Sequence, residues 1–187
     1  MEYLMVDDHI HLQLLKPSHS VLIYEAICSN REFLRKWLPF VDQTRKLRDT
    51  EMFVKQISRN QEKTGDYVYT VWYRGDFAGL AGFKDTDAAN NKTEIGYWLI
   101  ESMQAKGIMT RTVKKLVDYA FRNLDRNRIQ IKTATGNDRS AGIPRRLGFT
   151  LEGLERNGER NGNHYRDLEV YSLLKREWID RLLNDFP

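Results

Sequence analysis

The fold of this chain is decided by one short turn, which reads Gln104-Ala105-Lys106-Gly107-Ile108-Met109-Thr110. The turn lies between an apolar, strand-like run at residues 94–100 and a strongly amphipathic helical stretch. Its glycine lets the backbone approach a ligand closely because no side chain intervenes. The N–H groups at the start of the following helix point outward and carry a partial positive charge. The segment therefore predicts a cradle for a diphosphate, with a plain connector as the alternative when the segment is taken alone.

Size and composition predict a single domain covering residues 1–187, since domains commonly run to ~100–200 residues. The chain is 41% hydrophobic and 30% charged, which supplies a packed core and a soluble surface. No apolar run approaches the ~20 residues of a membrane span, and the first residues lack the pattern of a signal peptide. The single cysteine excludes an internal disulfide, so we expect a cytoplasmic protein. Because no apolar run is long enough to span a membrane, we expect no membrane partner.

Positive charge gathers in one block of the sequence. Residues 101–150 hold 11 Lys/Arg and four Asp/Glu, a local balance of +7, although the whole chain carries only +4. The block contains the Gly turn and the helix after it, and a concentrated positive region favours a multiply charged anion. Aromatic residues are sparse among these charges and no nucleic-acid motif appears, so we expect no direct nucleic-acid partner. A solvated basic face is the alternative interpretation.

Alternating and helical apolar patterns predict an α+β fold with a mixed, mostly antiparallel twisted sheet of six to seven strands flanked by helices. The expected strands are residues 9–16, 67–73, 77–83, 93–100, 128–135, 149–156 and 165–174, with a polar loop at 85–92. A first helix is expected to begin at residue 17. The other expected helices are residues 30–37, 50–61, the stretch after the Gly turn, 138–147 (broken by Gly142 and Pro144) and 175–183.

The centre of the chain predicts a parallel pair of strands. Residues 93–100 and 128–135 flank the amphipathic helix that follows the Gly turn. A strand, a long helix and a second strand form a βαβ-like unit, in which the two strands are parallel. We expect the Gly turn at the carboxyl end of the first of these strands.

Three local patterns resemble the GNAT superfamily of acyl-CoA N-acyltransferases. Its CoA loop has the form Gln/Arg-x-x-Gly-x-Gly/Ala, and Gln104-x-x-Gly107-x-Met109 is similar except at its last place. Residues 94–100 resemble the family's central strand. Residues 137–141, followed by 146–149, resemble its second cofactor segment. The resemblance extends from about residue 9 to 176, so it implies the acyl-CoA N-acyltransferase fold.

Within the superfamily, the chain is most similar to the Rim-type branch, which acetylates the amino termini of ribosomal proteins. Residues 94–98, 106–110 and 171–178 carry this similarity. The resemblance implies acetyl-CoA as cosubstrate and pantetheine bound where the two parallel strands splay apart. The backbone at 98–100 and 106–110 then meets the cofactor, and Asn137 anchors its amide, although a helix cap is the alternative role for Asn137. The implied cofactor residues are Trp98, Leu99, Ile100, Gln104, Lys106, Gly107, Ile108, Met109, Thr110 and Asn137.

The resemblance also implies catalytic groups, with one departure from the family. The usual acid is a tyrosine at the place of Pro144, which leaves Ser140 as the nearest hydroxyl. Glu94 and Glu152 are the two candidate bases, with an ordinary solvated or ion-paired carboxylate as the alternative for each. The backbone N–H near Leu99 is the expected oxyanion donor. The four histidines lack metal-like spacing, so we expect no metal.

Together these features lead us to expect an acetyl-CoA-dependent N-acetyltransferase that acts on a primary amine, most naturally a protein N-terminus, by direct transfer in a ternary complex. Trp37, Phe40 and residues 157–163 are expected to form the acceptor groove. A small-amine acetyltransferase for polyamines or aminoglycosides, a non-catalytic acyl-CoA-binding module and a ribosome-docking protein stay open as alternatives. We expect a monomer or a homodimer.

Overall fold

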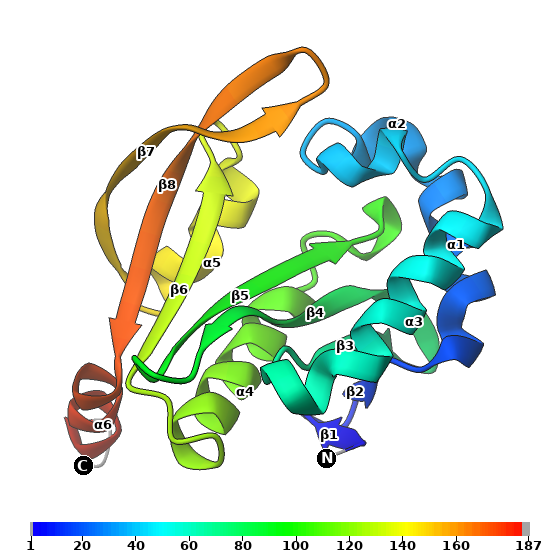
Figure 1. Cartoon of the computed structure of the whole chain (residues 1–187). Helices are drawn as coiled ribbons and strands as arrows, with labels where there is room; N and C mark the ends of the chain where they lie inside the picture. Colours follow the sequence, from blue (N-terminus) through cyan, green and yellow to red (C-terminus); the bar gives the residue numbers. More distant parts are fainter. Residues whose placement is uncertain (1, 185–187) are drawn as a thin grey trace.

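The computed structural model describes residues 2–184 and has one open, twisted sheet with strand order β1-β2-β3-β4-β5-β6-β8-β7 (Figure 1). Neighbouring strands are antiparallel except β5 and β6, which are parallel. The predicted α+β class and the central parallel pair are confirmed. The strands are β1 Tyr3–Met5, β2 Ile10–Leu14, β3 Val68–Tyr73, β4 Asp76–Asp87, β5 Lys92–Leu99, β6 Arg128–Ala134, β7 Thr150–Asn161 and β8 His164–Leu174.

The sheet has eight strands rather than six to seven because a short edge strand, β1, pairs with β2. Three residues are too few to show an alternating pattern in the sequence. The expected polar loop at 85–92 is also shorter, since β4 continues to Asp87 through an irregular register. Both differences lie away from the parallel pair and leave the centre of the sheet as expected.

Helices cover both faces of the sheet, and their bounds follow the apolar periodicity of the sequence. Apolar side chains of α4 pack in the main core, which also contains buried residues of β2 to β6 and β8. Side chains of α1, α2 and α3 form a second core on the other face, together with Phe77 and Leu80 of β4. The helices are α1 Ser20–Ser29, α2 Arg31–Leu34, α3 Leu47–Thr64, α4 Ile108–Arg122, α5 Asp138–Arg146 and α6 Lys175–Asn184.

The parallel strands β5 and β6 separate along their length. Their register runs from Lys92 opposite Arg128 to Glu94 opposite Gln130, and no later pair joins them among the described residues. β5 nevertheless continues to Leu99 and β6 to Ala134. The two strands therefore diverge into a wedge that opens toward α2 and the β7–β8 hairpin (Figure 1).

Helix α5 was predicted to break at Gly142 and Pro144, and that prediction is wrong. The helix is continuous from Asp138 to Arg146 with Pro144 inside it. A proline removes one intrahelical hydrogen bond, so the carbonyl four residues earlier, that of Ser140, loses its usual donor. The structure supplies another donor for this oxygen from β5: the hydroxyl of Tyr97 lies 3.1 Å from it.

Candidate active site

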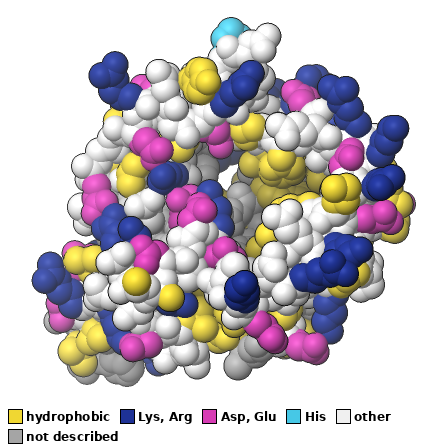
Figure 2. All heavy atoms as spheres, viewed as in Figure 1, with side chains coloured by type: hydrophobic (Ala, Val, Ile, Leu, Met, Phe, Trp, Pro, Cys, Tyr) yellow, Lys and Arg dark blue, Asp and Glu magenta, His cyan; other side chains and the backbone are white. Residues whose placement is uncertain are grey.

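Two cavities meet at the wedge. The first, of about 910 Å³, lies between the sheet, α3 and the β7–β8 hairpin, and the second, of about 810 Å³, lies beside the Gly turn and α5. Figure 2 shows the hollow, with hydrophobic side chains along one wall and charged side chains along the other. The residues that line both cavities are Trp37, Leu38, Tyr97, Trp98, Asn137 and Ser140. The mouth of the wedge thus connects two chambers, as a reaction between two substrates requires.

The Gly turn leads directly into α4. Gly107 is the N-cap residue and has φ of 69°, a left-handed conformation that glycine adopts without steric cost. The first N–H groups of an α-helix have no partner within the helix, so those of residues 108–110 are available at the second cavity. This arrangement can hold an anion at the start of α4.

Arg111 holds the turn from behind. Its guanidinium donates to the backbone oxygens of Lys106, at 3.2 Å, and Gly107, at 3.4 Å. The same group pairs with Asp7 at 2.5 Å. Because Arg111 binds the carbonyl oxygens of the turn, the backbone N–H groups of the turn face the cavity. Asp7 neutralises the guanidinium, which makes Arg111 a support for the turn rather than a free anion ligand.

Nine of the ten residues predicted to contact a cofactor line the second cavity, and Ile100 does not. The backbone of Ile100 is already used: its N–H donates to Ala78 at 2.9 Å, and its oxygen accepts from Met103 at 3.2 Å. The sequence shows apolar strand residues but not which of their N–H groups face a neighbouring strand. The backbone contact expected from Ile100 therefore stays a prediction, and the cavity lining does not include this residue.

Leu99 is the residue whose backbone faces the wedge. N–H groups along a strand point alternately to its two sides. Since the N–H of Ile100 donates to β4, the N–H of Leu99 points the opposite way, toward β6 beyond the last β5–β6 pair. The Leu99 side chain is buried in the main core. The position expected for an oxyanion donor thus presents a backbone N–H to the gap.

The basic block contributes less free charge to the site than its balance of +7 suggests. Five of its members form ion pairs with carboxylates: Arg111, Arg122, Arg128, Lys132 and Arg145. Three others line the second cavity, namely Lys106, Arg139 and Arg146. Arg146 also donates to the Thr110 hydroxyl at 3.2 Å, which places its charge at the first turn of α4. Arg146 thus brings positive charge to the start of α4, while Lys106 and Arg139 line the same cavity.

Asn137 and Ser140 lie at the junction of the two cavities. Asn137 is the N-cap of α5, and its side-chain oxygen accepts from the Ser140 N–H at 3.3 Å. The helix-cap alternative for Asn137 is therefore present in the structure, while the residue also lines both cavities. The Ser140 hydroxyl lies 3.4 Å from the hydroxyl of Tyr97. Burial raises the pKa of Tyr97, so the phenol stays protonated.

The two candidate bases differ in their surroundings. Glu94 lines the first cavity but is buried, 6% exposed, and pairs with Lys84 at 2.8 Å. Glu152 lies outside both cavities, where it pairs with Arg128 at 2.6 Å and accepts from Ser172 at 2.8 Å. The hydrogen bond from Arg128 lowers the pKa of Glu152. The structure therefore removes Glu152 from the site, because register turns its side chain to Arg128 on β6 instead.

A third carboxylate, Glu159, was not singled out from the sequence. It lies on β7, lines the first cavity and has no ion-pair or hydrogen-bond partner among the described residues. Burial raises the pKa of Glu159, although Lys84 and Arg166 lower it. The segment 157–163 was expected to line an acceptor groove, and Gly158 and Glu159 of this segment do line the first cavity. The sequence carries no local signal for Glu159 because only long-range packing buries it.

The hairpin of β7 and β8 reaches across the wedge to α2, as Figure 1 shows. Arg166 of β8 donates to the Lys36 oxygen, and its guanidinium lies over the Trp37 ring, 5.4 Å from the centroid. These contacts join the β7–β8 hairpin to the segment after α2, where Trp37 lines both cavities. Among residues 2–184, no helix is long and apolar enough to cross a bilayer, and no group of three side chains has the makeup of a metal site.

Comparisons with known proteins agree with this geometry. Residues 9–150 match the family model of the acetyltransferase (GNAT) domain. The putative ribosomal N-acetyltransferase YdaF of Bacillus subtilis (strain 168) is 37% identical over 175 residues, which cover 92% of this chain and 95% of that protein. RimL, a ribosomal L7/L12 α-N-protein acetyltransferase solved in complex with coenzyme A, has a TM-score of 0.89 and 26% identity, covering 92% of this chain and 98% of that chain.

A further solved structure, the microcin C7 self-immunity acetyltransferase MccE in complex with acetyl-CoA and AMP, has a TM-score of 0.85 and 28% identity. The match covers 90% of this chain and 94% of that chain. The family model spans most of the sequence, and the match to RimL covers 92% of this chain. The chain therefore belongs to the GNAT acetyltransferase family and is an N-acetyltransferase.

Proposed function

We propose that acetyl-CoA binds in the second cavity with its phosphates at the start of α4. Coenzyme A carries a diphosphate and a 3′-phosphate, and the residues of this chain suit such a ligand. The N–H groups of residues 108–110 lie at the start of α4, and Lys106, Arg139 and Arg146 supply positive charge to the same cavity. Met109 differs from the small residue of the family loop, but its side chain is buried in the core, so only its backbone faces a ligand.

The acceptor amine enters from the first cavity, and transfer takes place where the cavities meet. Acetyl-CoA supplies a thioester, whose carbonyl carbon the neutral amine attacks. The carbon–sulfur bond then breaks, and the amine loses one proton. Glu159 is the proposed acceptor of that proton, directly or through water, while the Leu99 N–H stabilises the oxyanion. In this proposal the Ser140 hydroxyl hydrogen-bonds the departing thiolate and passes it a proton, which the serine regains from the protonated Glu159 through water.

Glu94 is retained as a second proposed carboxylate in the acceptor cavity. It forms an ion pair with Lys84, and its side chain is buried. Burial is the main reason that the pKa of Glu159 is raised, and we assign Glu94 the role of adding to this rise, because its negative charge also disfavours the ionised form of Glu159. A carboxyl with a raised pKa is a better base for an α-amino group, whose pKa is about 7.7–8.0.

The observation that favours a protein N-terminus is the number of carboxylates in the first cavity that have neither an ion-pair nor a hydrogen-bond partner. Five carboxylates line it, and four are held by other groups: Asp49, Asp66, Asp85 and Glu94. Of these five, only the Glu159 carboxylate has neither an ion-pair nor a hydrogen-bond partner among the described residues. One available carboxylate suits a single ammonium group, whereas a polyamine carries several and requires more than one such partner.

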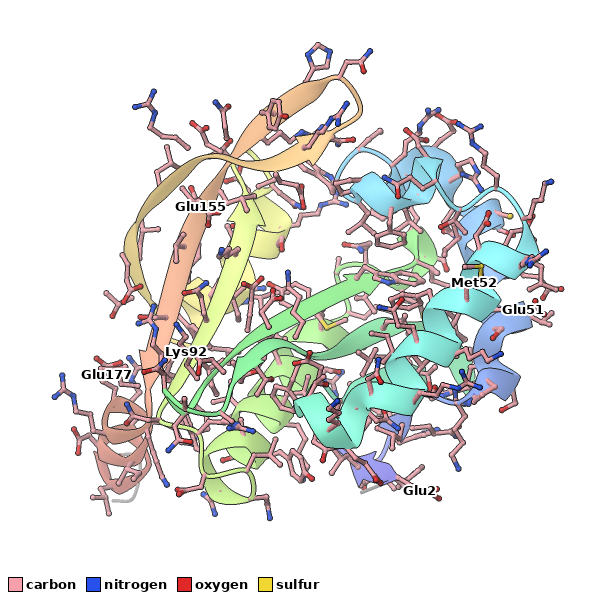
Figure 3. The ribbon with its side chains drawn as sticks, viewed as in Figure 1. Glu2, Glu51, Met52, Lys92, Glu155 and Glu177 are labelled. Atoms are coloured by element: carbon pink, nitrogen blue, oxygen red, sulfur yellow. The ribbon has the colours of Figure 1, made fainter. Side chains whose placement is uncertain are left out.

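The wall opposite the strands supports the same acceptor. Phe40, Met52 and Phe53 are 39%, 62% and 45% exposed at the mouth of the first cavity. Figure 3 places Met52 on α3 and Glu155 on β7, on opposite sides of the opening. An open mouth with an apolar side accommodates an extended peptide whose terminal amine points inward. We therefore propose that the enzyme acetylates protein N-termini, among them those of ribosomal proteins, in the cytoplasm.

A peptide-panel assay tests this proposal. Peptides with free Ser, Ala and Met N-termini, matched peptides with blocked N-termini and an internal lysine, and spermidine are each incubated with enzyme and acetyl-CoA. Release of free thiol gives the rate, and mass spectrometry of the product locates the acetyl group. We expect turnover on free N-termini only. Preferential acetylation of spermidine or of the lysine side chain would refute the proposed acceptor.

A pair of matched variants tests the proposed base. Glu159→Gln removes the carboxylate in the cavity, and Glu152→Gln makes the same change on the same strand outside it. We expect kcat to fall by about 100-fold for Glu159→Gln, the lower end of the usual effect of a general base. Glu152→Gln should keep wild-type kcat. Equal kcat values for the two variants would exclude Glu159 as the base.

A further inference from the structure

Pro144 leaves a gap in the hydrogen bonding of α5. In an α-helix, the N–H of residue 144 donates to the carbonyl of residue 140, but proline has no N–H. The Ser140 carbonyl is half-buried beside the wedge, where an unpaired oxygen is costly. Helix α5 nevertheless continues through Pro144 without a break. Something outside the helix must therefore satisfy the Ser140 carbonyl.

Tyr97 of β5 fills the gap. Its hydroxyl donates to the Ser140 carbonyl at 3.1 Å and accepts from the Ser140 hydroxyl at 3.4 Å. The ring packs against the main core, so the hydroxyl cannot swing away freely. One phenol thus binds both polar groups of Ser140, and it does so across the wedge, from the strand on one side to the helix on the other.

We propose that Tyr97 is a positioning residue that replaces the hydrogen bond lost at Pro144 and thereby fixes Ser140 for the transfer step. This inference rests on the proposed role of Ser140. The Tyr97 proton is committed to the Ser140 carbonyl, so Tyr97 does not serve as the acid. Its hydroxyl instead orients the serine at the junction of the two cavities. Tyr97 and Pro144 form a matched pair, because the Tyr97 hydroxyl supplies the hydrogen bond that Pro144 cannot donate to the Ser140 carbonyl.

A double-mutant cycle with Tyr97→Phe and Pro144→Ala tests this pair. Tyr97→Phe leaves the Ser140 carbonyl without a donor, and we expect kcat to fall by about tenfold while the acetyl-CoA KM stays within about twofold, as for misplaced catalytic groups. The thermal unfolding midpoint should also fall. Pro144→Ala restores a backbone N–H that can donate to the same carbonyl. Alone it should change kcat little.

The double variant gives the decisive result. If Tyr97 acts by positioning, Tyr97→Phe combined with Pro144→Ala recovers both kcat and the unfolding midpoint toward wild type, because the helix again supplies the donor. Recovery of the midpoint without kcat would overturn the positioning role, since Tyr97 would then act on the reacting atoms. A wild-type kcat in Tyr97→Phe would also overturn it.

The stability part of the cycle does not depend on the reaction. If no substrate is acetylated, the proposed function fails, yet the unfolding midpoints of the four proteins still report whether Tyr97 and Pro144 are coupled. Additive changes in the midpoint would contradict the matched pair whatever the activity. Should Tyr97→Phe alone be too unstable to purify, its recovery by Pro144→Ala would support the inference by the same reasoning, and failure of the double variant to fold would count against it.

Discussion

Replacing Gly107 by alanine adds one methyl group to the Gly turn and so tests the proposed anion cradle there. Gly107 has φ of 69°, and a Cβ added there would meet nothing closer than the Arg111 Nε, at 3.9 Å. The space is therefore open, and the cost of Gly107→Ala is conformational only. A left-handed conformation costs an L-residue about 1–2 kcal/mol. The turn of the variant relaxes to avoid this strain, and ligand binding must restore it.

The expected size of the effect follows from that cost. Each 1.4 kcal/mol is tenfold in an equilibrium constant, so about 1–2 kcal/mol raises the Kd for coenzyme A by about 5–30-fold. Isothermal titration calorimetry of coenzyme A into each protein measures this change directly. The kcat at saturating acetyl-CoA should stay close to wild type, because the residues proposed for chemistry are untouched.

Gly75→Ala is the matched control. Gly75 also has a left-handed φ, of 89°, with nothing within 4 Å of an added Cβ, and it lies in the β3–β4 turn outside both cavities. Its replacement places the same kind of strain in a turn that no ligand needs to restore. Only Gly107→Ala should bind coenzyme A more weakly. Unchanged affinity in Gly107→Ala, or equal weakening in Gly75→Ala, would refute the cradle.

Three further predictions concern the acceptor side and the surface. Burial raises the pKa of Glu159 above its ordinary value of 4.5, so ionisation of this carboxyl opposes folding. The unfolding free energy should therefore fall as the pH rises from 4.5 through the raised pKa. Glu159→Gln should remove that pH dependence in urea titrations, and a wild-type-like profile would contradict the buried environment. Met52→Ser should raise the KM of a peptide with an apolar second residue by about three- to tenfold without changing the acetyl-CoA KM. Leu151→Ser, on an exposed leucine of β7, should change neither KM. Equal peptide KM values for the two variants would count against an apolar acceptor wall. Arg128 lowers the pKa of Glu152, so the stability from their partly exposed pair is present above pH 4.5 and lost below it. Glu152→Gln should therefore cost about 1 kcal/mol or less at pH 7, as urea unfolding would show, and a larger loss would contradict the exposed setting.

The centre of the fold was predictable because its patterns are local. The strand at residues 92–99 and the amphipathic α4 carry strong periodicities, and the Gly turn between them fixes where they meet. The parallel pairing of β5 and β6 was predictable because the connection between them is long enough to contain a helix. These elements bring together nine of the ten expected cofactor residues, since consecutive positions in one turn cannot lie far apart.

The missing parts depend on long-range contacts. The continuity of α5 was not predictable, because the donor that compensates for Pro144 is the hydroxyl of Tyr97, 47 positions earlier in the numbering. Glu159 and Glu152 lie on the same strand, and only the register of β7 decides that one faces the cavity and the other faces Arg128. The backbone direction of Leu99 and Ile100 likewise follows from pairing with β4.

Amide hydrogen exchange at Leu99, followed by NMR, tests the central claim most directly. In the free protein the Leu99 N–H faces the wedge, whereas the Ile100 N–H, bonded to Ala78, serves as an internal reference. We expect Leu99 to exchange fast without ligand and to slow by about 100-fold with acetyl-CoA at about 100 times its Kd, since only the free form then exchanges. Ile100 should be slow in both states. A Leu99 amide that is already protected, or that acetyl-CoA leaves unchanged, would contradict the wedge as the site of acetyl transfer.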